Sequence, residues 1–248
     1  PLPAKAIRAT MSASSDTAYS PKHLTVAQAH EIERAVAARA MAYILLETRS
    51  AYCYGDEPFT FTSGRRSPVY IDCRQLISFP RARAKLMDLA VEAIQRDIGY
   101  ESIDVVAGGE TAGIAFAAWI AERMGLPMVY VRKQPKGFGR MAQIEGIMAE
   151  GARVLLVEDL ATDGGSKVNF INAIREAGGV IADCMVLFHY GIYPVSVSSL
   201  AEMGVKLHGL ATWWDVIEEA ESRGYFPPDK AKVVREFLND PENWQPEA

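Results

Sequence analysis

The most informative chemical pattern in the sequence lies between residues 154 and 166. The apolar run 154–157 is followed directly by the acids Glu158 and Asp159, and then by a turn-forming stretch at residues 162–166 that contains two glycines. Acids at the end of a parallel strand accept hydrogen bonds from the vicinal hydroxyls of a sugar. The free N–H groups of a glycine-containing turn that opens a helix suit a phosphate. Each half alone is common in α/β proteins, but together they predict a sugar-phosphate site.

Two further segments carry groups suited to phosphates. Arg132 and Lys133 end an apolar run, and residues 134–143 form a loop with Gly, Pro and Lys136 that would close over a polyanion and exclude water. A solvated basic loop is the alternative interpretation. Residues 108–111 (Gly-Gly-Glu-Thr) follow another apolar run, and their two glycines would let backbone N–H groups approach a diphosphate closely. A plain tight turn is an equal alternative there.

Strands and helices are expected to alternate around these segments. The patterns predict strands at residues 103–107, 128–131, 153–157, 180–188 and 205–210. They predict helices at about residues 80–98, 112–124, 166–177 and 229–238, with another after Trp214 and a short one after Tyr190. Because near-continuous apolar strands joined by helices form parallel sheets covered on both faces, we predict an α/β fold.

The N-terminal part is predicted to contribute a helix and short strands. Thr25 to Gln28 has the form of a capping box, which predicts a helix to about Thr48. We expect this helix to pack on the main body through an apolar stripe at spacing four: Ile32, Val36, Ala40 and Ile44. The β-prone runs 59–61 and 69–71 flank a Ser-Gly-Arg-Arg-Ser-Pro segment, which indicates a hairpin or a ligand-facing loop.

The sequence contains no internal repeat and no linker long enough to divide it. Residues 1–20 are small, polar and rich in Pro, Ser and Thr, so we predict a flexible tail, with Met11 as a candidate natural start. The rest is predicted to be one domain, made of a hood at about 21–78, a core at about 79–212 and C-terminal helices at about 213–248.

Composition and charge exclude several classes of protein. The 248 residues carry a net charge of −5 and have a pI near 5.5, so no global basic field is available for nucleic acid or anionic lipid. The longest apolar stretch, residues 40–46, is too short to span a membrane. The three cysteines, Cys53, Cys73 and Cys184, are far apart and suggest reduced thiols in a cytoplasmic protein. Neither a GxxxxGK[ST] motif nor a complete dinucleotide fingerprint is present.

Residues 154–166 resemble the phosphoribosyl diphosphate signature of the type I phosphoribosyltransferases, which carries apolar residues, two acids and a Thr/Gly-rich turn. Three other segments resemble the orotate phosphoribosyltransferase family: residues 61–68, 131–136 and 144–146. The resemblance covers about residues 59–188. It implies a mainly parallel sheet flanked by helices, with an N-terminal helical and hairpin hood and added C-terminal helices.

The resemblance also implies roles for individual residues. Glu158 and Asp159 would hold the ribose hydroxyls, and residues 162–166 the 5′-phosphate. The full set expected to bind phosphoribosyl diphosphate is Arg132, Lys133, Lys136, Glu158, Asp159, Leu160, Ala161, Thr162, Asp163, Gly164, Gly165 and Ser166. The expected catalytic groups are Lys133, Lys136 and Asp159. The implied cofactor is Mg²⁺, which would bridge substrate oxygens, with Asp159 as its one candidate protein ligand.

The sequence departs from the family pattern at several positions. Thr62 and Ala112 stand where Lys is common, Phe138 replaces a loop His, and His189-Tyr190 replaces an Asp-Arg pair whose Arg meets the orotate carboxylate. Asp163 adds a negative charge in the phosphate turn. The expected orotate-binding groups are therefore Thr162, Ser63, Gly64, Arg65 and Tyr190, because several neutral donors can hold a carboxylate.

We therefore expect a Mg²⁺-dependent transferase that makes orotidine 5′-phosphate and diphosphate from orotate and phosphoribosyl diphosphate in pyrimidine synthesis. A homodimer is expected by resemblance, with the 134–143 loop mobile without ligand and reaching the neighbouring subunit's site. Nucleic acid and membranes are not expected partners. The alternatives are a salvage phosphoribosyltransferase for another base and a non-catalytic regulator that senses phosphoribosyl diphosphate.

Overall fold

A six-stranded sheet forms the centre of the structure, a computed structural model that describes residues 24–55, 57–61, 64–137, 139, 143–162 and 165–246. The strand order is β10-β9-β8-β5-β6-β7. The bounds are β5 (Val105–Gly109), β6 (Met128–Val131), β7 (Ile144–Glu145), β8 (Arg153–Ala161), β9 (Val180–His189) and β10 (Lys206–Ala211). All pairs are parallel except the antiparallel β6–β7 pair. The predicted α/β fold with a mainly parallel sheet is confirmed.

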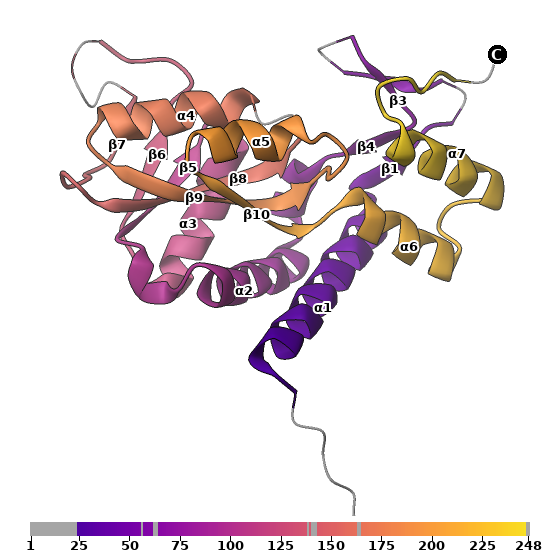
Figure 1. The fold of residues 1–248 in the computed structure, drawn as a ribbon, viewed down its shortest axis with the longest axis horizontal. Helices are drawn as coiled ribbons and strands as arrows, with labels where there is room; N and C mark the ends of the chain where they lie inside the picture. Colours follow the sequence, from indigo (N-terminus) through magenta and orange to yellow (C-terminus); the bar gives the residue numbers. More distant parts are fainter. Residues whose placement is uncertain are drawn as a thin grey trace, which may run out of the picture.

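Helices cover both faces of this sheet, as Figure 1 shows. One face carries α2 (Pro80–Asp97) and α3 (Ala112–Met124), and the other carries α4 (Gly165–Glu176) and α5 (Val195–Glu202). Side chains of a strand alternate between faces. In β8, Leu155 and Val157 accordingly join one buried apolar cluster, whereas Leu156 joins the other. Both faces are buried, which explains the unbroken apolar sequence of this strand.

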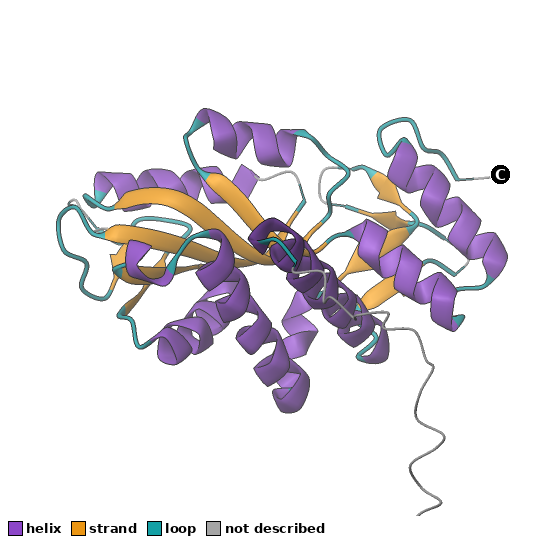
Figure 2. Ribbon diagram, turned by 60° about the horizontal axis from the view of Figure 1, so that its bottom comes forward, coloured by secondary structure: helices purple, strands orange, loops and turns teal. Residues whose placement is uncertain are grey.

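The N- and C-terminal elements lie together at one end of the sheet (Figure 1). They comprise α1 (Val26–Glu47), β1 (Ala51–Cys53), β2 (Phe59–Thr60), β3 (Arg66–Ser67), β4 (Val69–Ile71), α6 (Trp213–Arg223) and α7 (Pro228–Asn239). Two small antiparallel sheets, β1-β4 and β2-β3, form here, and α1 packs against α6. Figure 2 shows the two C-terminal helices beside these strands. Two 3-10 helices, Cys73–Ser78 and Tyr100–Ser102, complete the elements of the described ranges.

The packing face of α1 differs from the prediction. Thr25 caps the helix with Gln28 in a capping box, as expected. However, Ile32 and Val36 are 49% and 59% exposed, and the buried residues are Ala37, Met41, Ala42, Leu45 and Leu46. The predicted stripe at spacing four was wrong for these two residues. A strict four-residue spacing drifts around a helix of 3.6 residues per turn, so residues at its start and end face different sides.

The strands extend further than the sequence predicted. β8 continues to Ala161 because its pairing with β9 continues to the Ala161–His189 pair, so Glu158 and Asp159 lie within the strand. β5 likewise includes Gly108 and Gly109, which the sequence analysis placed after the end of this strand, either as a diphosphate-binding segment or as a tight turn. None of the helices in the described part of the chain has the length and apolar character needed to cross a membrane.

Candidate active site

A cavity of about 390 Å³ opens where β5 and β8 end. Ligands of open parallel sheets bind at this edge. The walls come from the end of β4, the start of α3, the end of β6, the end of β8 and the start of α4. The lining residues are Tyr70, Ile71, Asp72, Cys73, Arg74, Glu110, Thr111, Ala112, Lys133, Glu158, Asp159, Leu160, Thr162, Ser166 and Lys167.

The two acids of β8 occupy different positions in this cavity. Glu158 is only 7% exposed, and its Oε1 has no hydrogen-bond partner among the residues that the structure describes. A Cβ on Gly109 or Gly113 would overlap Oε1, so these two glycines make room for the carboxylate. Asp159 follows on the opposite side of the strand, where its neighbour in space is Cys73. Both predicted acids therefore line the cavity.

Burial disfavours the charged form of both acids. It raises the pKa of Glu158 to about 7, against the lowering effect of Lys167, and the nearby Asp159 raises this pKa further. Burial also raises the pKa of Asp159, which Lys167 lowers in part. Carboxylates of this kind gain from a ligand that donates hydrogen bonds or brings positive charge. The site therefore suits sugar hydroxyls or a metal complexed with substrate.

The turn after β8 lies beside the acids. Leu160, Thr162 and Ser166 line the cavity, whereas Ala161 is fully buried beneath it. Gly165 begins α4, and the N–H groups in the first turn of a helix are suited to an anion. The predicted residues Asp163 and Gly164 lie outside the described residues. Three described members of this segment therefore line the cavity, and its role as a phosphate site stays a prediction.

The basic segment after β6 is only partly at the cavity. Lys133 lines it, and the Lys133 backbone N–H donates to Glu110 Oε2 at 2.7 Å. Arg132 instead forms an ion pair with Glu145, at 3.4 Å between Nη1 and Oε1. Lys136 is exposed and does not line the cavity. Phe138 and residues 140–142 of the predicted loop lie outside the described residues.

The residues expected to bind orotate are not gathered at the cavity. Thr162 lines it, but Gly64 is exposed and the Arg65 guanidinium lies over the Tyr193 ring, 4.4 Å from its centroid. Tyr190 is 1% exposed and packs in an aromatic cluster with Phe61, Phe188, Tyr193 and Trp213. Burial raises the pKa of the Tyr190 hydroxyl. Ser63 lies outside the described residues.

Several cavity residues were missed by the sequence analysis. Asp72 Oδ1 accepts hydrogen bonds from the Arg74 backbone N–H at 3.2 Å and from Arg74 Nε at 2.8 Å. Arg74 Nη2 donates to the Tyr70 hydroxyl at 3.2 Å. The available signal was a polar, charged run directly after the predicted strand 69–71. Lys167 was also missed, because nothing in the sequence distinguishes it from a solvated lysine of a helix.

The carboxylates of the cavity could contribute oxygen ligands to a metal ion that is bound mainly through substrate. Within the described ranges, no group of three or more His, Cys, Asp or Glu residues is arranged to hold a metal ion. Magnesium is commonly bound through one or two carboxylates together with substrate phosphates. Asp159, which lines the same cavity as Glu158, fits that mode of binding.

Comparisons with known proteins agree with this architecture. A sequence model described as phosphoribosyl transferase domain matches residues 74–222. An orotate phosphoribosyltransferase of Dinoroseobacter shibae is 56% identical over 213 residues, covering 86% of this chain and 94% of the relative.

Solved structures of orotate phosphoribosyltransferases have a similar fold. The crystal structure of orotate phosphoribosyltransferase from Aeropyrum pernix is similar with a TM-score of 0.64 and 33% identity, covering 75% of this chain and 99% of the other. The Mycobacterium tuberculosis H37Rv enzyme in complex with 5-phospho-α-D-ribosyl 1-diphosphate shares the fold, with a TM-score of 0.56 and 23% identity, covering 74% of this chain and 98% of the other.

The mainly parallel sheet and the match over residues 74–222, a range that contains Glu158, Asp159 and the start of α4, define a phosphoribosyltransferase. Within that class, the identities to curated relatives extend over most of the chain. The chain belongs to the orotate phosphoribosyltransferase family.

Proposed function

We propose that this chain transfers the phosphoribosyl group of phosphoribosyl diphosphate to orotate, giving orotidine 5′-phosphate and diphosphate in pyrimidine biosynthesis. The observation that carries the proposal is the cavity in which Glu158 and Asp159 adjoin Thr162 and Ser166. This arrangement places sugar-hydroxyl acceptors beside a phosphate site. The many relatives named orotate phosphoribosyltransferase support the choice of base.

In this reaction N1 of the base forms a bond to C1′ while the bond from C1′ to the diphosphate oxygen breaks. The electron pair leaves with the diphosphate, and the N1 proton passes to solvent. No covalent intermediate with the protein is needed, so the protein positions the reactants and stabilises charge. Asp159 and Glu158 orient the ribose, Thr162 to Ser166 hold the 5′-phosphate, and Lys133 faces the diphosphate, with Arg132 and Lys136 as further cations of that segment.

Magnesium, when bound with the substrate, would neutralise the leaving diphosphate, and Asp159 is the residue suited to contact it. We also propose a cytoplasmic homodimer, on the basis of the family resemblance. Sedimentation at micromolar concentration tests the dimer, and a single monomeric species would exclude it.

The test of the function is turnover of phosphoribosyl diphosphate and Mg²⁺ with orotate, uracil, hypoxanthine, adenine and guanine in parallel. We expect orotate to be consumed clearly faster than the others. Exclusive use of uracil or a purine would refute the orotate assignment and support a salvage enzyme. Binding of phosphoribosyl diphosphate without reaction of any base would favour a sensing protein.

A further inference from the structure

Lys167 is a buried lysine at the floor of the candidate active site. Its side chain lies in the first turn of α4 and lines the cavity, yet the residue is only 2% exposed. Its Nζ donates to the carbonyl oxygen of Leu160 at 2.6 Å. This hydrogen bond spans seven residues, from the end of β8 to the start of α4. It therefore bridges the two ends of the segment that carries the proposed phosphate site.

The position is an unfavourable one for a lysine. Removing an ammonium group from water is strongly unfavourable unless the group is paired and hydrogen-bonded. A cation in the first turn also meets the positive end of the helix dipole. The costs are offset locally, because the Leu160 carbonyl accepts from Nζ and the carboxylates of Glu158 and Asp159 are close enough to interact with its charge. An apolar side chain of similar length would fill the space without these costs.

The contacts of Lys167 explain what the ammonium group contributes. The Leu160 carbonyl belongs to the last residues of β8, and Thr162 follows it at the cavity wall. Ser166 lies on the other side of the turn, directly before Lys167. The bond between Nζ and the Leu160 carbonyl therefore connects a residue close before Thr162 to the residue directly after Ser166, and restrains these two cavity residues from both sides. Cavity residues restrained before binding lose less conformational entropy when they bind an anion.

We propose that Lys167 is a positioning residue, which joins the end of β8 to the first turn of α4 and holds Thr162 and Ser166 at the spacing that a 5′-phosphate requires. This inference rests on the proposed function, because it takes Thr162 and Ser166 to hold the 5′-phosphate. The role of Lys167 differs from the roles proposed for Arg132, Lys133 and Lys136, which face the diphosphate.

The test compares two probes in titration calorimetry, ribose 5-phosphate and magnesium diphosphate. Lys167→Met, which removes the donor and keeps the length of the side chain, is expected to weaken ribose 5-phosphate binding about tenfold. Binding of magnesium diphosphate should change less than about twofold, because the hydrogen bond from Lys167 to Leu160 acts on Thr162 and Ser166 and not on the residues proposed to face the diphosphate. Lys167→Arg retains a donor and should restore most of the ribose 5-phosphate affinity. Lys232→Met, at an exposed lysine of α7, is the matched control and should change neither affinity.

Each other outcome has a separate meaning. Unchanged ribose 5-phosphate binding in Lys167→Met would overturn the inference and leave the proposed function intact. Equal weakening of the binding of both probes would assign Lys167 a general charge effect. A Lys167→Met protein that shows no folded state in urea denaturation would assign Lys167 a purely structural role. Both outcomes overturn the inference. A wild-type protein that binds magnesium diphosphate but not ribose 5-phosphate would instead refute the proposed 5′-phosphate site itself.

Discussion

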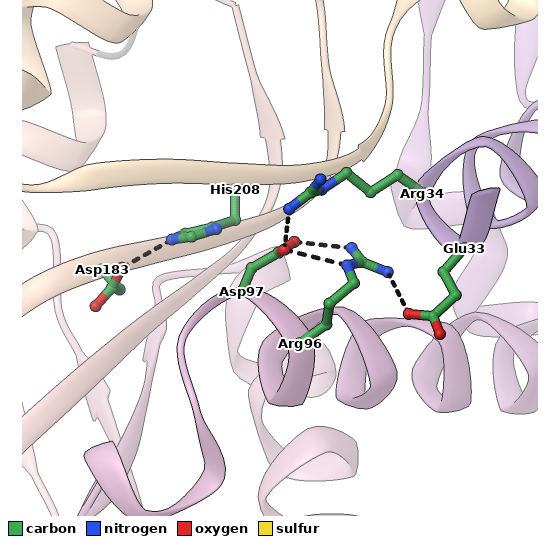
Figure 3. Close-up of polar contacts among 6 residues, drawn as sticks. All are labelled: Glu33, Arg34, Arg96, Asp97, Asp183 and His208. Atoms are coloured by element: carbon green, nitrogen blue, oxygen red, sulfur yellow. Dashed lines mark hydrogen bonds and ion pairs between the residues drawn. The ribbon is translucent and has the colours of Figure 1, made fainter. Parts of the chain in front are cut away.

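Arg34 on α1 and Asp97 at the end of α2 form an ion pair, with Arg34 Nη2 donating to Asp97 Oδ1 at 2.6 Å (Figure 3). Arg96 Nη2 donates to Asp97 Oδ2 at 2.7 Å, and Arg96 Nη1 lies 3.9 Å from Glu33 Oε2. The side chains of Arg96 and Asp97 are 7% and 12% exposed. One carboxylate thus accepts from two guanidinium groups and connects the N-terminal helix to the α/β core.

Asp97→Asn is expected to lower the free energy of unfolding by about 1.5 to 3 kcal/mol at pH 7, because it removes charge-assisted hydrogen bonds. Burial acts to raise the pKa of Asp97, but hydrogen bonds from Arg96 and Arg34 outweigh it and lower this pKa to about 2. Since the folded pKa lies below the ordinary value, this stabilisation is present above about pH 4 and is lost as the pH falls towards 2. Urea denaturation at several pH values measures the difference.

Asp88→Asn is the matched control for that experiment. The Asp88 carboxylate pairs with Arg123 at 2.8 Å, but its side chain is 54% exposed. Exposed ion pairs contribute about 0 to 1 kcal/mol, so this substitution should have a small effect. Equal losses in the two variants would contradict the importance of the Asp97 network.

Asp159→Asn is expected to weaken phosphoribosyl diphosphate binding by about 1.5 to 3 kcal/mol while leaving the fold intact, because a charged acceptor is lost from the cavity. Titration calorimetry measures the affinity. Asp183→Asn is the control, since Asp183 pairs with His208 on neighbouring strands and does not line the cavity. Unchanged affinity in Asp159→Asn would refute its proposed role with the ribose.

Glu158→Gln should stabilise the protein relative to wild type as the pH rises from 5 to 8. Burial raises the pKa of Glu158 to about 7, above its ordinary value of 4.5, so the folded state holds a proton that the unfolded state has lost. The unfolding free energy of the wild type therefore falls between about pH 4.5 and 7, where only the unfolded state ionises, and levels off above pH 7, whereas the variant lacks this dependence. The difference between the two unfolding free energies should shift by about 1 to 3 kcal/mol in favour of the variant. A pH-independent difference would show that Glu158 ionises normally.

Gly113→Ala should lower stability and weaken phosphoribosyl diphosphate binding, although alanine favours helices by about 1 kcal/mol. A Cβ at this position would overlap Glu158 Oε1 and lie 2.5 Å from the Val157 carbonyl oxygen, so the carboxylate must move. Gly55→Ala is the control, because nothing lies within 4 Å of a Cβ there. Thermal melting and calorimetry report the two effects. A Gly113→Ala protein as stable as Gly55→Ala would mean that the site repacks at no cost.

The sequence predicted the central sheet well because its strands are buried on both faces and read as apolar runs. Helix 112–124 was predicted with its observed bounds, and the start of β8 was located at Arg153. The acids of the site were found because charge after such a run is exceptional. The end of β8 was not predicted, because it depends on pairing with β9, which no local sequence pattern encodes.

The rest of the site depends on contacts between distant segments. Asp72 and Arg74 reach the cavity because β4, far from β8 in sequence, ends beside it. Lys167 was missed because a helical lysine normally lies in solvent, and only tertiary packing buries this one. The exposure of Ile32 and Val36 likewise reflects which side of α1 meets α6 and the sheet edge.

The final prediction concerns the base. Tyr190→Phe should leave the KM for orotate and for phosphoribosyl diphosphate within about twofold of wild type, because its side chain packs in the aromatic core outside the described cavity lining. Tyr70→Phe is the informative companion, since the Tyr70 hydroxyl accepts from Arg74 at the cavity wall. Because Tyr70 lines the cavity, Tyr70→Phe should raise the KM for orotate more than Tyr190→Phe does. Steady-state kinetics with each substrate varied in turn separates the two constants. A rise of more than about tenfold in the orotate KM of Tyr190→Phe alone, with the phosphoribosyl diphosphate KM unchanged, would show that the base reaches the Tyr190 hydroxyl and that the aromatic cluster opens on binding.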